Sequence, residues 1–282
     1  MKDADNRLCK DKIDDLVENL RRRHSVAVAF SGGVDSSLVA ALAHRALGQK
    51  ALAITIDSPL MPSADLDDAK RTAKEIGIGH MTLGLNELDI PGFGANPPDR
   101  CYLCKRFRFE KLKEKAIELN LETVADGTNT SDLGEYRPGV KAAKELGIYS
   151  PLLEARLSKE DTRMMGDLLG LPTAAKPASP CLATRIPYGQ PLELATLQRI
   201  DRAEGHIRTL TGVKVLRVRD HGNLARIEIG QDEIDLLSNV EMLHQISQSL
   251  KGLGYEYVTL DLEGYRSGSF DQTFHPGFPR SN

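Results

Sequence analysis

A run of small and polar residues near the N-terminus has the composition of a phosphate-binding loop: Ser31, Gly32, Gly33, Val34, Asp35, Ser36 and Ser37. Gly32 and Gly33 carry no Cβ atom, so their main-chain N–H groups can approach a phosphate oxygen closely. Ser31 and Ser36 add hydroxyl donors, and the carboxylate of Asp35 can bind Mg²⁺ or brace the loop. The Gly-Lys-Ser/Thr ending of a Walker A loop is absent. We therefore expect a phosphate site of another kind, with a plain helix-capping turn as the alternative.

The local order of elements favours the phosphate site. Residues 26–30, Val-Ala-Val-Ala-Phe, form a continuous apolar run typical of a buried parallel strand. An Ala/Leu-rich stretch that reaches about Leu47 follows the loop and predicts a helix. The N-terminal end of a helix is positively polarised and attracts anions. Strand, loop and helix thus occur in the order that phosphate binding requires.

Cysteines supply the second chemistry-bearing group. Cys101 and Cys104 are separated by two residues, and Cys181 lies in a proline-rich segment that also carries Arg185. If a helix opens near Cys101, positions i and i+3 lie on one face. A stiff segment with a cation nearby favours the thiolate form of Cys181, which suits a nucleophile or a metal ligand. A buried structural cysteine is the commoner alternative, and we interpret Cys9 as incidental.

The elements that must position these residues alternate between strand and helix over the first two-thirds of the chain. Beyond the first strand, the patterns predict strands at 51–56, 81–83 and 123–125 and helices at 8–23, 63–77 and from about 101. Ser63 is expected to be the N-cap of its helix. The alternation predicts an α/β domain, residues 1–188, with a parallel sheet covered by helices on both faces.

The pattern changes near residue 190. Helices are predicted at 194–210 and 240–250, and strands at 213–218, 224–229 and 255–262. We interpret residues 189–270 as a smaller α+β domain that serves substrate binding or oligomerisation. Residues 271–282 are interpreted as a C-terminal tail.

Composition limits the classes of function. Of 282 residues, 40% are hydrophobic and 27% charged, which is typical of a globular protein long enough for two domains. No stretch is apolar enough to span a membrane, and the charged N-terminus lacks the apolar core of a signal peptide, so we expect a cytoplasmic protein without a membrane partner. The four cysteines are too few for a disulfide framework. A net charge of −3 offers no general attraction to nucleic acid.

The phosphate-binding loop resembles the pyrophosphate loop of the PP-loop ATP pyrophosphatase superfamily, whose domain is adenine nucleotide alpha hydrolase-like. These enzymes cleave ATP between its α and β phosphates and pass AMP to a substrate oxygen. The resemblance implies ATP and Mg²⁺ as cofactors, with Asp35 as a Mg²⁺ ligand. The Asp-Gly-Thr-Asn segment that contains Gly127 and Asn129 is similar to the superfamily's second nucleotide segment, although such a turn at a strand end is common. Asp57 and Ser58 lie where the adenosine is usually embraced.

A second segment narrows the resemblance. Residues 179–189, Ser-Pro-Cys-Leu-Ala-Thr-Arg-Ile-Pro-Tyr-Gly, resemble the LarE family, together with Arg137-Pro138-Gly139 and the 157–163 stretch. LarE is the sulfur insertase that builds the nickel-pincer nucleotide cofactor. The resemblance implies an enzyme that adenylates a carboxylate of a pyridinium dicarboxylate mononucleotide and converts it to a thiocarboxylate. It also implies a homo-oligomer, and it assigns catalytic roles to Cys181, the sulfur-bearing cysteine, and to Arg185.

In single-cysteine members of that family, the residue matched by Cys181 gives up its own sulfur and becomes dehydroalanine. This chain departs from that pattern because Cys101 and Cys104 supply further thiols. We hypothesise that the three thiols hold a catalytic [4Fe–4S] cluster with one open iron, to which an external donor delivers sulfide for repeated turnover. A zinc site, a transient disulfide and the sacrificial route remain alternatives.

Arginines are candidate contacts to phosphate and carboxylate groups of the substrate, because a guanidinium fork matches such oxygens. Arg137 belongs to the LarE-like pattern, and Arg217 and Arg219 alternate on a predicted strand and share one face. Glu228, on the next predicted strand, is a candidate contact to metal or substrate. Solvated arginines at a sheet edge and a paired surface carboxylate are the structural alternatives.

Two other classes of function stay open. A PP-loop tRNA thiolase can carry a Cys-x-x-Cys pair and a distant cysteine, but the acidic balance of this chain disfavours RNA binding. An ammonia-dependent PP-loop ligase would share the phosphate loop and would need neither Cys181 nor the pair Cys101 and Cys104.

Overall fold

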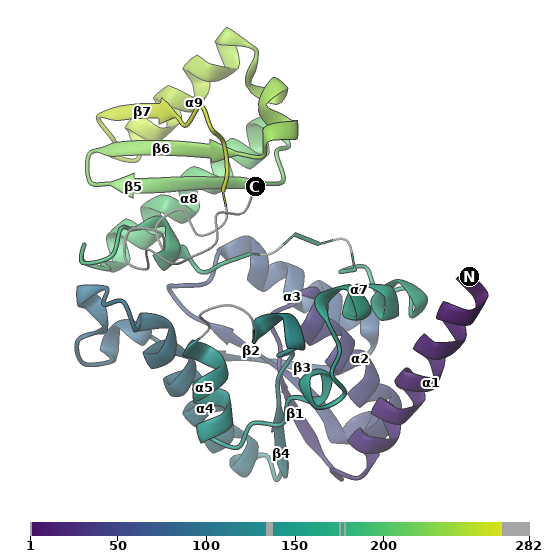
Figure 1. Ribbon diagram of the computed structural model, residues 1–282. Helices are drawn as coiled ribbons and strands as arrows, with labels where there is room; N and C mark the ends of the chain where they lie inside the picture. Colours follow the sequence, from purple (N-terminus) through teal and green to yellow (C-terminus); the bar gives the residue numbers. More distant parts are fainter. Residues whose placement is uncertain (1, 134–137, 175, 178, 267–282) are drawn as a thin grey trace. The chain divides into compact units, whose positions relative to one another are not determined.

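A computed structural model of the chain describes residues 2–133, 138–174, 176–177 and 179–266 (Figure 1). Arg137 and the predicted tail at 271–282 lie outside the described residues. The chain divides into two compact units. The first comprises the described parts of 1–87 and 99–179, and the second those of 88–98 and 180–282. The units divide after Ser179, and the two-domain division expected at residue 188 stays a prediction.

A parallel sheet forms the centre of the first unit, which confirms the predicted α/β class. Its strands are β1 (Val26–Ala29), β2 (Ala51–Asp57), β3 (Gly79–Gly84) and β4 (Thr123–Ala125), in the order β3-β2-β1-β4. Neighbouring strands pair in parallel, for example Ala27 of β1 with Leu52 of β2. The loop that follows β1 lies at the carboxyl edge of the sheet, with β2 on one side of β1 and β4 on the other. α/β proteins bind ligands at this edge.

Helices cover both faces of this sheet (Figure 1). They are α1 (Lys2–Arg21), α2 (Val34–Leu47), α3 (Ser63–Ile76), α4 (Arg100–Glu118), α5 (Pro138–Glu145), α6 (Pro151–Glu154) and α7 (Lys159–Leu168). On one face Leu20 of α1 and Leu38 of α2 belong to the same core as Val28. On the other face Phe109 of α4 packs in a core with Ile54. The apolar runs of β1 and β2 are therefore buried from both sides, as the sequence pattern predicts.

Helix starts determine where several candidate residues lie. The prediction that Ser63 caps its helix is wrong, because Pro62 occupies the N-cap position of α3 and Ser63 is the first helical residue. The helix predicted near Cys101 is confirmed as α4, which begins at Arg100. None of the helices in the described part of the chain is long and apolar enough to cross a membrane.

The second unit contains a sheet of β5 (Leu216–His221), β6 (Leu224–Ile229) and β7 (Tyr257–Leu260). β5 and β6 are antiparallel, and β6 and β7 are parallel. α8 (Leu194–Thr211) and α9 (Val240–Gly252) supply Ile207 and Leu250 to a core that also contains Val218 and Ile227. These elements agree with those predicted, except that β5 spans Leu216–His221 and not 213–218, and β7 spans Tyr257–Leu260 and not 255–262.

Short 3₁₀ helices lie between several of these elements: η1 (Gly48–Lys50), η2 (Glu87–Asp89), η3 (Phe93–Ala95), η4 (Thr130–Asp132), η5 (Leu182–Arg185) and η6 (Gln231–Leu237). η3 belongs to the second unit although it lies far upstream in sequence. The Asn96 side chain that follows it donates to the Pro187 carbonyl at 2.9 Å, and the Gly189 N–H donates to the Asn96 carbonyl at 3.1 Å. These bonds attach the segment 88–98 to the turn that follows Cys181.

A buried polar cluster ties β5 to α8 and to the segment before β7. The Tyr255 hydroxyl and Arg199 Nη2 each donate to Asp220 Oδ2 at 2.7 Å. The Gly222 N–H donates to Asp220 Oδ1 at 2.9 Å in the turn between β5 and β6. Burial raises the pKa of the Tyr255 hydroxyl well above its ordinary value, and the Asp220 carboxylate adds to the rise. The hydroxyl therefore remains a donor throughout the physiological pH range.

Tyr255→Phe is expected to lower the free energy of unfolding by about 1–3 kcal/mol, because it removes a donor from the buried Asp220 carboxylate. A raised pKa in the folded state means that the stabilisation is complete below about pH 10 and falls as the pH rises further. Urea unfolding of wild type and variant at about pH 7 and about pH 11 measures both effects. A difference in stability that does not shrink at the higher pH contradicts this account.

Candidate functional site

The loop after β1 has the geometry of a phosphate cradle braced from within. α2 begins directly after Gly33. The Ser36 hydroxyl donates to the Gly33 carbonyl at 3.1 Å and accepts from the Ser31 N–H at 3.2 Å. Ser37 is fully buried, and its hydroxyl has no hydrogen-bond partner among the described residues. Ser36 thus shapes the loop, and the direct phosphate contacts expected of Ser36 and Ser37 stay predictions.

Two glycines are required by close contacts between backbone segments. Gly32 has a φ of +69°, and a Cβ on it would lie 2.8 Å from Cα of Ala69 in α3. A Cβ on Gly127 would lie 2.8 Å from the Ser36 nitrogen and 2.9 Å from Cβ of Asp35. The loops after β1 and β4 therefore touch each other at backbone distance, which places the two predicted nucleotide segments together.

Asp35 is the meeting point of these segments. Its Oδ1 accepts from Asn129 Nδ2 at 3.1 Å, and its Oδ2 forms an ion pair with Lys159 Nζ. Asn129 is 2% exposed, and its own Oδ1 accepts from the Ser131 N–H at 3.0 Å, which fixes the amide. Asp35 and Lys159 remain 23% and 36% exposed, so both ends of the ion pair can be reached from solvent. The sequence prediction included Asp35 and Asn129 but missed Lys159.

The position of Lys159 in the sequence indicates that this lysine needs an anionic partner. Ser158 and Asp161 form a capping box at the start of α7, so Lys159 is the first residue of that helix. A cation at a helix N-terminus is repelled by the helix dipole. Such a lysine needs a carboxylate or a bound anion nearby, and Asp35 supplies the carboxylate here.

The segment expected to embrace the adenosine is held by an arginine that sequence reasoning also missed. Arg108 of α4 donates through Nη2 to Ser58 Oγ at 3.0 Å and through Nε to Glu87 Oε1 at 2.5 Å. Glu87 is fully buried after β3, whereas Asp57 is exposed at the end of β2. Arg108 therefore clamps the carboxyl ends of two neighbouring strands.

Cys101 and Cys104 lie in the first turns of α4, where Cys101 is exposed and Cys104 is partly buried. Their spacing places them on one face of the helix, and Arg108 continues the same stripe. No acidic residue lies in the first turn of α4. All four cysteines are described, and none of them forms a disulfide. The thiol chemistry expected of this pair stays a prediction.

Cys181 belongs to the second unit, at the N-cap position of η5. Arg185 Nη1 donates to the Pro180 carbonyl at 2.7 Å, to the Cys181 carbonyl at 3.1 Å and to Thr184 Oγ1 at 2.9 Å. Its Nε and Nη2 donate to the two carboxylate oxygens of Glu204 in α8 at 2.9 and 3.1 Å. The fully buried Arg185 therefore fixes the backbone of the cysteine turn, in addition to the electrostatic role expected of it.

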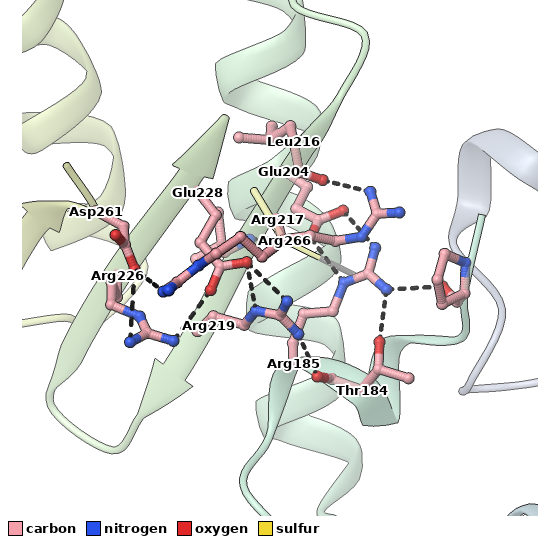
Figure 2. A network of polar contacts seen from close by, with 12 residues as sticks. Thr184, Arg185, Glu204, Leu216, Arg217, Arg219, Arg226, Glu228, Asp261 and Arg266 are labelled. Atoms are coloured by element: carbon pink, nitrogen blue, oxygen red, sulfur yellow. Dashed lines mark hydrogen bonds and ion pairs between the residues drawn. The ribbon is translucent and has the colours of Figure 1, made fainter. Parts of the chain in front are cut away.

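Opposing effects set the pKa of each partner in that pair. Burial lowers the pKa of the Arg185 guanidinium, but Glu204 outweighs burial and raises it overall. Burial raises the pKa of the Glu204 carboxyl, but Arg185, with Arg208, holds it below its usual value. Both groups stay charged, and Figure 2 shows them side by side.

Arg219 extends the same network to the sheet (Figure 2). It donates through Nε and Nη2 to Glu228 Oε2 at 2.9 and 2.7 Å and through Nη1 to the Thr184 carbonyl at 2.6 Å. Arg226 donates to Glu228 Oε1 at 3.0 Å. Arg219 is 5% exposed and Glu228 is fully buried. For Arg219 and Glu228 the two structural alternatives, a solvated arginine at an edge and a surface carboxylate, are therefore wrong.

Arg217 lies among other cations. It is 4% exposed, its Nη1 donates to the Leu216 carbonyl at 2.6 Å, and its guanidinium lies 4.9 Å from the ring centre of Tyr265. Burial lowers the pKa of Arg217, and the nearby Arg185 lowers it further. The Glu204 carboxylate offsets part of this lowering of the pKa. The substrate contacts expected of Arg217, Arg219 and Glu228 stay predictions, and Arg137 lies outside the described residues.

The residues present can be compared with the needs of each expected cofactor. Asp35 offers a partly exposed carboxylate beside the phosphate loop, which suits Mg²⁺ because this ion binds one or two carboxylates together with substrate phosphates. Across the described residues, no group of three or more His, Cys, Asp or Glu side chains is arranged to hold a metal ion. Cys101 and Cys104 belong to the first unit and Cys181 to the second, so the cluster stays a hypothesis.

Comparisons with known proteins agree with this geometry. Residues 9–92 match the family model described as asparagine synthase, which covers the phosphate loop. An uncharacterized protein of Synechocystis is 44% identical over 92% of this chain and 98% of its own length. The pyridinium-3,5-bisthiocarboxylic acid mononucleotide synthase of Lactiplantibacillus plantarum is 36% identical over 92% of this chain and 93% of its own length. The chain belongs to the LarE family.

Membership of the LarE family covers both units, because the match to the synthase spans nearly the whole chain. The glutamine-hydrolysing GMP synthase of Nitrosococcus oceani is 29% identical over 55% of this chain and 34% of its own length. The LarE resemblance and the PP-loop fold class expected from the sequence are thus confirmed. The match to this family supports the use of ATP by the chain.

Gly32→Ala is expected to lower the free energy of unfolding by more than about 2 kcal/mol, because it combines a left-handed backbone with a clash against the α3 backbone. Gly33→Ala is the matched control. Gly33 has a φ of −85°, and the atom nearest to an added Cβ would be the Ser31 hydroxyl at 3.4 Å. Chemical denaturation of both variants without nucleotide measures the difference. Equal losses in the two variants would contradict the proposed packing.

Proposed function

We propose that this protein is an AMP-forming sulfur transferase that converts a carboxylate of a pyridinium dicarboxylate mononucleotide to a thiocarboxylate during nickel-pincer cofactor biosynthesis. The observation that carries the proposal is the near full-length match to the Lactiplantibacillus plantarum synthase, which includes both the phosphate loop and the Cys181 turn. The contacts around Asp35 and Arg185 supply a physical role for each segment.

In the first step a substrate carboxylate oxygen attacks the α-phosphorus of ATP. An O–P bond forms, the bond between the α-phosphorus and the bridging oxygen breaks, and pyrophosphate leaves. The N–H groups around Gly32 and Gly33 and the positive end of α2 stabilise the departing charge. Lys159 is close enough to the same loop to exchange its contact with Asp35 for a phosphate oxygen. Mg²⁺ held by Asp35 would supply further charge neutralisation.

In the second step sulfur displaces AMP from the activated acyl carbon. A C–S bond forms and the C–O bond to AMP breaks, so AMP takes the electron pair. If Cys181 is the donor, its Cβ–S bond then breaks by elimination with loss of the Cα proton, which leaves dehydroalanine. If sulfide comes from an external donor, Cys181 is unchanged and the enzyme turns over repeatedly.

Cys101 and Cys104 favour sulfide from an external donor as the sulfur source. They lie on one face of α4 beside basic residues. Together with Cys181 they provide three thiolates for a [4Fe–4S] cluster, which leaves one iron without a protein ligand. We keep the sacrificial use of Cys181 as the alternative.

Buried cations of the second unit are the proposed contacts to the anionic groups of the substrate. Arg217 has the strongest physical reason to accept an anion, because burial and neighbouring cations lower its pKa. Arg219 already binds the Glu228 carboxylate and the Thr184 carbonyl. We assign Arg217 to a phosphate or carboxylate of the substrate and Arg219 with Glu228 to the wall beside it.

A cytoplasmic homo-oligomer completes the proposal. Several large apolar side chains of η6 and α9 are exposed, including Leu236, Val240 and Leu243. Contacts between copies would cover such a surface. A tRNA thiolase and an ammonia-dependent ligase remain the competing functions, and the products formed from ATP and the pyridinium mononucleotide distinguish them.

Incubation with α-labelled ATP and the pyridinium dicarboxylate mononucleotide is expected to give AMP and a thiocarboxylate. Mass spectrometry of the protein then separates the two sulfur sources. With the cluster, Cys181 keeps its mass and anaerobically reconstituted protein makes several products per chain, whereas Cys101→Ser and Cys104→Ser lose the cluster absorption. Loss of one sulfur at Cys181 indicates the sacrificial route. ADP as the labelled product, or dependence on tRNA, contradicts the proposed function.

Lys159→Met is expected to slow pyrophosphate release about 100-fold, because a preorganised cation next to the phosphates is removed. Lys12→Met is the matched control, since Lys12 of α1 is 37% exposed and pairs at 3.6 Å with Asp161 in the same first turn of α7, without contacting Asp35. Pyrophosphate release with saturating substrate measures both variants. A Lys159→Met protein as fast as Lys12→Met excludes a role for Lys159 in the first step.

A further inference from the structure

The segment that precedes Cys181 is held against α3 by polar and charged contacts. The proposed reaction steps give these contacts no role. We call residues 172–179 the tether, of which 172–174, 176–177 and 179 are described. Lys176 Nζ lies 3.4 Å from Asp65 Oδ1 and 3.0 Å from Asp68 Oδ2. The Ser179 hydroxyl donates to the other oxygen of Asp65. The first two turns of α3 therefore hold both Lys176 and Ser179 of the tether.

These contacts are less exposed to solvent than ordinary surface ion pairs. The side chains of Lys176, Asp65 and Asp68 are 22%, 15% and 32% exposed, so solvent screens them only in part. Burial raises the pKa of Asp68, but Lys176 and Arg71 outweigh burial and hold it below its usual value. Because Lys176 contacts two carboxylates, its position is restricted more than a single ion pair would restrict it.

The start of the tether is also fixed, by apolar contacts. A Cβ built on Gly166 of α7 would lie 3.5 Å from Cβ of Ala174 and 3.8 Å from Cγ2 of Val34, the first residue of α2. Ala174 is 5% exposed. The tether thus begins beside the phosphate loop and ends on α3.

The same part of α3 touches the phosphate loop. A Cβ on Gly32 would lie 2.8 Å from Cα of Ala69, and Ala69 lies one helical turn after Asp65. Cys181 is two residues beyond Ser179, so the chain between them spans at most about 7 Å. Fixing Ser179 on Asp65 therefore restricts where the Cys181 thiol can go, whatever the flexibility of the peptide bonds between them.

We propose that Lys176 is a positioning residue for sulfur transfer, and that Asp65 and Asp68 hold it so that Cys181 is delivered to the acyl adenylate. Confining a reacting group raises its effective concentration and speeds the step in which it reacts. The adenylation step involves no atom of the tether and does not depend on this contact. This inference rests on the proposed function, because it assumes that sulfur transfer involves Cys181 either as donor or as cluster ligand.

The test separates the two half-reactions in the full-length protein. Exchange of labelled pyrophosphate into ATP, in the presence of the pyridinium dicarboxylate mononucleotide, measures adenylation alone. The ratio of thiocarboxylate to AMP in a single turnover measures how many adenylates receive sulfur and how many are hydrolysed. For Lys176→Ala we expect exchange within about twofold of wild type and a thiocarboxylate-to-AMP ratio at least about tenfold lower.

Two further variants make the result specific. Lys70→Ala removes a lysine of α3 itself, whose partner Asp67 lies at 3.7 Å with both side chains well exposed, and it should change neither half-reaction. Lys176→Arg keeps a cation that can reach both carboxylates, and it should restore most of the wild-type ratio. Thermal unfolding of Lys176→Ala checks that the fold is intact.

Each outcome decides a separate question. If wild-type protein shows no substrate-dependent exchange, the proposed function fails and this inference falls with it. If wild type is active and Lys176→Ala keeps the wild-type ratio, the positioning role alone is overturned. A parallel loss of exchange and transfer also overturns it, because a general structural role would lower both. A lower ratio with normal exchange, restored by Lys176→Arg, supports it.

Discussion

The ion pair between Asp35 and Lys159 is the interaction on which the nucleotide site depends. It joins the first turn of α2 to the first residue of α7, which lie 124 residues apart in sequence. A carboxylate that is mostly buried costs free energy without a partner, and a lysine at a helix N-terminus is repelled by the helix dipole. Each charge compensates the other. Asn129 adds a third segment by donating to the same carboxylate, so loops from three parts of the chain converge on one side chain.

In the second unit, ion pairs also join separate elements, and there the charged groups are more deeply buried. Glu204 accepts from Arg185 of η5, from Arg208 of its own helix and from the Val218 N–H of β5, so it anchors two other elements to α8. Buried ion pairs contribute little net stability, because desolvation offsets most of the attraction. Their effect is on geometry, since breaking one leaves an uncompensated charge inside the protein. The network is therefore well suited to hold the turn of Cys181 in one conformation.

Local patterns in the sequence were sufficient for the fold and for part of the site. Strand and helix periodicity predicted the sheet of the first unit, and the loop from Ser31 to Ser37 was placed correctly after β1. Lys159, Arg108 and Lys176 were missed because their roles depend on partners far away in sequence, which no local pattern specifies. The burial of Arg219 and Glu228 was missed for a different reason. Charged residues on one strand face usually face solvent.

The strand register contained information that could have corrected that last point. Arg217 pairs with Glu228, and Arg219 pairs with Arg226, across the hairpin of β5 and β6. The two-residue turn at Gly222-Asn223 sets that register, so Glu228 lies opposite Arg217 and diagonal to Arg219. Opposite charges at such positions can satisfy one another and need no solvent. Alternating charged residues on paired strands can therefore indicate a buried network when the turn between them is short.

Charged contacts, more than apolar packing, hold the segments proposed to do chemistry. Apolar packing excludes water and fills space, so it stabilises the cores behind α2 and α8 but leaves no room for a ligand. A partly exposed ion pair can exchange one partner for an anion of the substrate at little cost, because the cation loses one negative partner and gains another. Lys159 beside the phosphate loop satisfies this condition. A site made in this way is ordered before the substrate binds and remains open to it.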